Sequence, residues 1–150
     1  MEGTAALRSP VRASAGPRFL RLKMASRREA IAPTVEEIAD FLDDLPLDPD
    51  RRANLRVALS EGLSNAVVHG NALCPERPVL VVCCLEIGRR AIVDVRDFGR
   101  GFDAAALLDC RDEERVLAPS GRGVFLMRQL VDRVVFNRRG NRVRLTMRAK

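Results

Sequence analysis

The sequence contains no tryptophan, no tyrosine and one histidine among its 150 residues. Tryptophan and tyrosine are the best side chains for stacking on nucleic-acid bases. Their absence argues against direct nucleic-acid binding, even though the formal net charge is +6. The arginines that carry this charge are scattered along the chain. A phosphate ligand or an acidic protein partner accounts for the same charge.

Long apolar runs are also missing. No stretch reaches the roughly 18 apolar residues of a membrane span, and the N-terminus lacks the apolar segment of a secretory signal. The four cysteines, which show no CxxC spacing, are Cys74, Cys83, Cys84 and Cys110. With one histidine, this spacing argues against a zinc site. We expect reduced thiols, no disulfide, a cytoplasmic location and no membrane contact.

What remains is enough for one domain. Hydrophobic residues make up 47% of the chain, which is sufficient for a sizeable core. Residues 1–17 contain Ser, Arg and Pro, are poor in acidic residues and show no amphipathic helix. The composition also fits an organellar transit peptide, but such a peptide would form an amphipathic helix. We therefore expect a disordered extension over 1–17 and a folded domain over 18–150.

The first half of the domain is predicted to be one strand and two helices. RFLRLKMAS (18–26) alternates apolar and basic residues, as in a strand. Thr34 and Glu37 have capping-box spacing and predict the start of a helix. LPLDPD (45–50) predicts a turn in which Asp48 or Asp50 caps a long helix over residues 51–69.

The second half is predicted to be two hairpins separated by a loop and a helix. VLVVCCLEI (79–87) and AIVDVRDF (91–98) are apolar runs joined by GRR. A glycine-bounded segment over 99–123 leads into a helix over 124–132, and strands are expected at 134–137 and 143–148. This order favours an α+β fold, a two-layer sandwich of a mostly antiparallel sheet with helices packed on one face.

Glycines frame the long loop. DFGRGFD (97–103) places an acid and two glycines at a strand end, and SGRG (120–123) repeats the Gly-x-Gly spacing at a helix start. Glycine lets the backbone approach a ligand closely, and a helix N-terminus directs free N–H groups toward anions. The pair predicts a lid over phosphates, although each pattern alone is also that of an ordinary turn.

Two polar residues lie within the apolar pattern of the long helix. Glu61 and Asn65 lie one turn apart, on the side opposite Leu59 and Leu63. A carboxylate there can act as a general base, and an amide oxygen is a suitable ligand for Mg²⁺. Taken alone, the pair also fits a solvated helix stripe.

The three stretches occur in a recognisable order. EGLSNAVVHGN (61–71), DVRDFGRGFD (94–103) and GRGVFLMRQLVDRV (121–134) resemble the boxes of the GHKL ATP-binding superfamily, which includes gyrase and histidine kinases. The chain looks most similar to the stand-alone anti-sigma-factor serine/threonine kinases. The resemblance spans roughly residues 18–148 and implies the Bergerat ATP-binding fold.

The resemblance implies a role for each matching residue. Glu61 would be the catalytic general base, and Asn65 the ligand of Mg²⁺ beside ATP. Asp97 would accept a hydrogen bond from the adenine amino group. Six further positions would bind the nucleotide, namely Gly99, Gly101, Gly121, Arg122, Gly123 and Thr146.

One departure from the family pattern lies in the lid. Related kinases carry a basic residue before the second glycine box, where this chain reads LAPSG. Arg115 and Arg122 are the alternatives for that charge. His69 lies at the end of the ATP-site helix and is interpreted as structural.

Two functions follow from the resemblance. One is a serine/threonine kinase that acts as an anti-sigma factor, with ATP and Mg²⁺ as cofactors and a sigma factor and a STAS-type antagonist as partners. The alternative is a non-catalytic, ATP-gated module that sequesters a partner without phosphorylating it. A homodimer is expected in either case.

Overall fold

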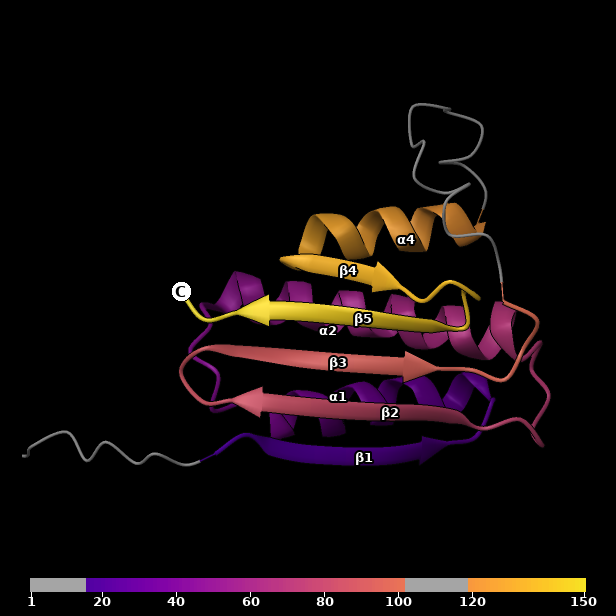
Figure 1. The fold of residues 1–150 in the computed structure, drawn as a ribbon, viewed down its shortest axis with the longest axis horizontal. Helices are drawn as coiled ribbons and strands as arrows, with labels where there is room; N and C mark the ends of the chain where they lie inside the picture. Colours follow the sequence, from indigo (N-terminus) through magenta and orange to yellow (C-terminus); the bar gives the residue numbers. More distant parts are fainter. Residues whose placement is uncertain (1–15, 102–118) are drawn as a thin grey trace, which may run out of the picture.

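A five-stranded antiparallel sheet forms one layer of the molecule, and helices form the other (Figure 1). The computed structural model describes residues 16–101 and 119–150. The strands are β1 (Arg18–Met24), β2 (Val79–Glu86), β3 (Arg90–Arg96), β4 (Arg133–Phe136) and β5 (Arg142–Arg148). Their spatial order is β1-β2-β3-β5-β4, and every neighbouring pair is antiparallel. The predicted α+β sandwich is therefore confirmed.

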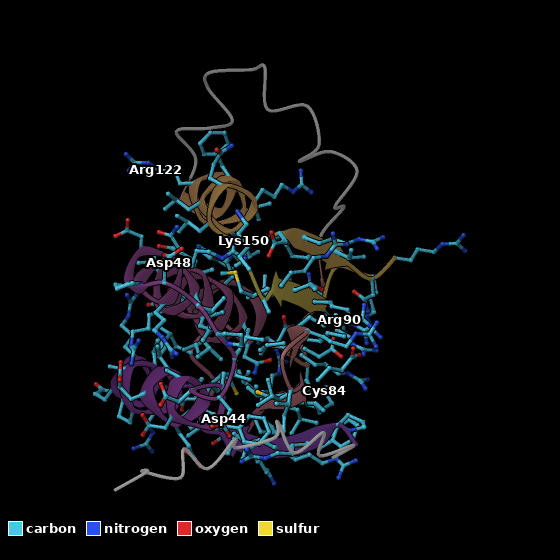
Figure 2. The ribbon with its side chains drawn as sticks, turned by 90° about the vertical axis from the view of Figure 1, so that its left-hand side faces the viewer. Asp44, Asp48, Cys84, Arg90, Arg122 and Lys150 are labelled. Atoms are coloured by element: carbon cyan, nitrogen blue, oxygen red, sulfur yellow. The ribbon has the colours of Figure 1, made fainter. Side chains whose placement is uncertain are left out.

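The helical layer covers one face of the sheet, as the end-on view shows (Figure 2). Its elements are η1 (Arg28–Ala30), α1 (Ile31–Phe41), α2 (Pro49–Ser64), η2 (Asn65–Gly70) and α4 (Pro119–Leu130). The long helix buries Leu59 and Leu63, on the side opposite Glu61 and Asn65, together with Leu55. None of these helices is long and apolar enough to cross a membrane.

Local signals predicted one helix start and missed the other. Asp48 caps α2, because its side chain accepts a hydrogen bond of 2.8 Å from the Arg51 N–H. The predicted capping box is wrong, since α1 begins at Ile31, before Thr34. The Thr34 hydroxyl instead donates to the Ala30 carbonyl at 2.8 Å, within the first turns of the helix.

Alternation along β2 separates the two neighbouring cysteines. Cys83 is buried in the core, whereas Cys84 lies on the opposite face and is partly exposed. Burial raises the pKa of the Cys83 thiol to about 12, which keeps it protonated. Cys74, Cys83 and Cys84 are free thiols. Cys110 lies outside the described residues, as do residues 1–15 of the predicted extension.

Candidate functional site

A cavity of about 520 Å³ opens where the end of the long helix meets the sheet. Its described walls come from η2, the end of β3, the start of α4 and the β4–β5 hairpin. Val95, Val124, Phe136 and Val143 form an apolar part of the wall, and Asn65 and Asp97 are polar. Volume and lining are those of a small-molecule site.

The helix widens as it reaches this cavity. From Asn65 to Gly70 the backbone is a π-helix, and the Asn71 N–H donates to the Ala66 carbonyl at 2.8 Å. Such i→i−5 turns are rare and occur often at functional sites. The wide turn places Asn65, His69 and Gly70 on the cavity wall.

A buried amide fastens the end of this turn to the sheet. The Asn71 side chain has no exposed surface. Its oxygen accepts from the Phe98 N–H at 2.8 Å, and its nitrogen donates to Ser26 Oγ at 2.8 Å and to the Arg77 carbonyl at 2.9 Å. Asn71 therefore holds the backbone next to Asp97 against η2. The sequence predicted that the helix ends before Asn71 but gave no indication of this role.

Asp97 forms part of the cavity wall and is 7% exposed. Burial raises the pKa of its carboxyl group, while the Gly99 N–H, which donates to Oδ1 at 2.8 Å, and the charge of Arg139 oppose that rise. The backbone bond also fixes the orientation of the carboxylate. Asp97 is thus a preoriented acceptor in a largely apolar cavity.

Three glycines allow the backbone to close around Asp97. A Cβ at Gly70 would overlap the Asp97 carboxyl group, and a Cβ at Gly99 would overlap the Gly70 carbonyl oxygen. Gly101 has φ of +79°, and a Cβ there would overlap the Arg139 carbonyl oxygen. Gly101 lines the cavity itself, whereas Gly99 acts by its contacts with Gly70 and Asp97.

Glu61, Asn65 and Gly123 meet beside the cavity. A Cβ built on Gly123 would lie 2.8 Å from Glu61 Oε2 and 3.3 Å from Asn65 Oδ1. The first turn of α4 therefore lies against the polar side of the long helix. Two of the stretches singled out in the sequence, separated along the chain, are brought together here.

The remaining predicted positions lie farther from this meeting point. Gly121 and Arg122 are in the first turn of α4, and Arg122 is exposed (Figure 2). Thr146 is not among the described residues that line the cavity. Successive β5 side chains alternate between faces, so Thr146 projects from the sheet face opposite to that of Val143. The structure therefore does not support Thr146 as a nucleotide contact, and Arg142 and Val143 at the start of β5 are the strand's residues that line the cavity.

Cations at the cavity rim were missed in the sequence. Arg77, Arg100 and Arg142 line the cavity and are exposed, and His69 lines it as well. Their signal was weak because arginine is common throughout this chain. Arg100 stands between the two glycines of DFGRGFD, a position that sequence analysis left without a role.

The residues present fit a magnesium nucleotide. The apolar wall suits a purine, Asp97 suits its amino group, and rim cations suit phosphates. The described residues contain no cluster of three or more His, Cys, Asp or Glu side chains. Mg²⁺ would accordingly be held by the Asn65 amide oxygen, with water and phosphate oxygens as its other ligands.

The contact between Gly70 and Asp97 yields a matched pair of glycine variants. In Gly70→Ala the new methyl group displaces the Asp97 carboxylate, so we expect ATP affinity to fall by about 5- to 150-fold. Gly62→Ala makes the same change earlier in the helical run, where the nearest atom, Met127 Sδ, lies at 3.5 Å. Gly62 also lines the cavity, but a methyl group there makes only ordinary contacts, so this control should lose much less affinity than Gly70→Ala. Calorimetric titration with MgATP measures both, and equal affinities would contradict the role given to the close approach.

The chain was compared with known proteins. A family model described as the histidine kinase-like ATPase domain matches residues 24–147. The anti-sigma F factor of Clostridium acetobutylicum is 26% identical over 135 residues, which cover 88% of this chain and 83% of that protein. The match contains β2, β3 and both helical walls of the cavity. The chain therefore belongs to the histidine kinase-like ATPase domain family.

Proposed function

We propose that this protein is an ATP-dependent serine/threonine kinase that acts as an anti-sigma factor. The observation that carries the proposal is the convergence of Glu61, Asn65 and Gly123 beside a cavity walled by Asp97. The similarity to the anti-sigma F factor of Clostridium acetobutylicum supports the choice among the activities of the family. The phosphoryl acceptor is then a STAS-type antagonist, and the sequestered partner a sigma factor.

Each residue has a separate task in this proposal. Asp97 orients the adenine, while Gly101 and Gly123 leave room for close approach of the backbone. We assign the same role to Gly121 in the first turn of α4. Glu61 takes the proton of the acceptor hydroxyl. Bound ATP and Mg²⁺ supply the phosphoryl group and part of the charge compensation that its transfer needs.

Arg100 and Arg77 are further candidates for phosphate contacts. Both line the cavity, and the LAPSG segment (117–121), whose last three residues belong to α4, carries no charge of its own. A guanidinium at the rim would compensate the phosphate charge that related kinases meet with a lid cation. Arg115, the other alternative from the sequence, lies outside the described residues.

The test is transfer of label from radioactive ATP. We expect a stable phosphoserine or phosphothreonine on a STAS protein encoded in the same genome, formed only with Mg²⁺ and this chain present. A STAS protein whose acceptor serine or threonine is replaced by alanine is the control. Labelling of that control, or no labelling of any candidate, would contradict the kinase proposal.

The uncharged LAPSG segment favours a second candidate, an ATP-gated module that holds its partner without phosphorylating it. The same incubation distinguishes the two, because partner capture that requires ATP but leaves the partner unlabelled identifies the module.

In either form we expect a cytoplasmic homodimer whose ATP-binding domain spans residues 18–150. Sedimentation at several protein concentrations measures the oligomeric state.

A further inference from the structure

One face of the sheet carries no helix of the described chain. The helices all pack on the other face, and Cys84 and Arg90 project from the side away from them (Figure 2). Strand alternation assigns the side chains of this open face, because residues paired across neighbouring strands point the same way. We call this surface the open sheet face.

The middle of the open sheet face is apolar. Phe19 pairs with Cys84, Cys84 with Ile92, and Ile92 with Thr146, so these four side chains form one row across four strands. Phe19 is 55% exposed, unusually high for a large aromatic side chain. Val82 lies next to this row on β2. Cys84 and Ile92 are partly exposed, whereas Thr146 at the end of the row is buried. A partly exposed apolar row of this kind marks an interaction site when charged residues surround it.

Basic residues surround this row on the side of β4 and β5. Arg133 pairs with Thr146 and so continues the apolar row at its end. Arg142, Arg144 and Arg148 alternate along β5 and are exposed. Four β5 side chains lie on this face, and all of them except Thr146 are arginines.

Basic residues also lie along β1 and at the two ends of β3. Arg21 and Lys23 follow Phe19 along β1 and are exposed. Arg90 and Arg96 lie at the two ends of β3 and point to the same face. The open sheet face thus gathers eight basic side chains from four strands. Arginines that look scattered in the sequence are clustered in the structure.

Two carboxylates on this face do not balance the charge. Asp94 accepts from both Arg142 and Arg144 at 2.8 Å, and Glu86 accepts from Arg90 at 2.8 Å. Subtracting these two acids from the eight basic residues leaves a formal charge of +6. This equals the net charge of the entire chain, so the rest of the molecule is balanced.

We propose that the open sheet face is the docking surface for an acidic protein segment that carries apolar side chains between its carboxylates. Charge complementarity selects the acidic partner, and the row from Phe19 to Ile92 requires apolar groups opposite it. A second copy placed face to face would oppose two surfaces of +6. Nucleic acid fits less well, because Phe19 is the one aromatic side chain in these rows. The inference does not rest on phosphoryl transfer, and the two can fail separately.

Two short fluorescent peptides test the surface on the full-length protein. One alternates glutamate with leucine and the other alternates glutamate with serine, so they carry equal charge. Measured by fluorescence anisotropy, the Glu–Leu peptide should bind more tightly at physiological ionic strength. The variant Phe19→Ser should lower the affinity for the Glu–Leu peptide by at least about 5-fold and leave the affinity for the Glu–Ser peptide nearly unchanged.

Charge is tested by a matched pair of double variants. Arg21→Gln with Lys23→Gln removes two charges from the open sheet face, and we expect binding to weaken by about 2- to 30-fold. Arg28→Gln with Arg56→Gln removes two charges from the helical layer and should change binding little. Equal effects of both pairs, equal binding of the two peptides, or tighter binding of duplex DNA through Arg21 and Lys23 would overturn the proposal.

Discussion

Glu61→Gln is expected to lower phosphoryl transfer by about 10²- to 10⁴-fold while ATP affinity stays close to that of the unaltered protein. Glutamine keeps the size of the side chain but cannot accept the proton of the acceptor hydroxyl. The Glu61 carboxylate lies beside Gly123 and Asn65 and is not among the described residues that line the cavity, so we expect nucleotide affinity to depend little on it. Single-turnover transfer to a STAS protein and calorimetric titration with MgATP measure the two effects.

Asn65→Ala is the comparison that separates catalysis from binding. Asn65 lines the cavity and is the expected Mg²⁺ ligand, so its loss should weaken MgATP binding as well as transfer. Capture of a partner that needs bound nucleotide should then persist in Glu61→Gln and fail in Asn65→Ala. Full transfer by Glu61→Gln would show that the pair is a solvated stripe of the helix.

Asp97→Asn is expected to weaken ATP binding by about 5- to 150-fold. The amide presents a donor where the adenine amino group needs an acceptor, and an unmatched polar pair in a buried site costs about 1–3 kcal/mol. The Gly99 N–H holds one oxygen of this side chain, so the fold around it should be retained. Calorimetry with ATP and with a nucleotide whose base lacks the amino group provides the test. If both nucleotides lose affinity equally, the role of Asp97 is structural.

The pH dependence of nucleotide affinity and of stability provides a second test of the role of Asp97. Burial raises its folded-state pKa, so the carboxylate takes up a proton at a higher pH than an exposed aspartate would. Nucleotide affinity that needs the ionised form is full above that pKa and declines as pH falls through it. The free energy of unfolding changes in the opposite direction. A raised folded-state pKa stabilises the folded protein at low pH, and this stabilisation is lost as pH rises through the folded pKa. Asp97→Asn should remove this contribution to both profiles.

The sequence by itself determined the elements and the order of the motifs. Apolar spacing in α2 and alternation in β2 report which side of each element is buried, and both signals are local. Asp48 capped α2 as its position predicted, since a cap involves residues within one turn. The prediction that Thr34 begins a helix was wrong, because the capping-box spacing also occurs inside a helix. There the hydroxyl donates to the carbonyl one turn earlier.

The tertiary structure alone decided how the site closes and what surrounds it. The bond from Phe98 to Asn71 and the contact of Gly70 with Asp97 join residues that are far apart along the chain, and both involve the end of the π-helical run at 65–70. No local pattern contains that information. Likewise, the register of five strands placed Thr146 away from the cavity and collected scattered arginines on one face. Pairing between strands, rather than composition, set both outcomes, because each side chain's neighbours are fixed only when the sheet forms.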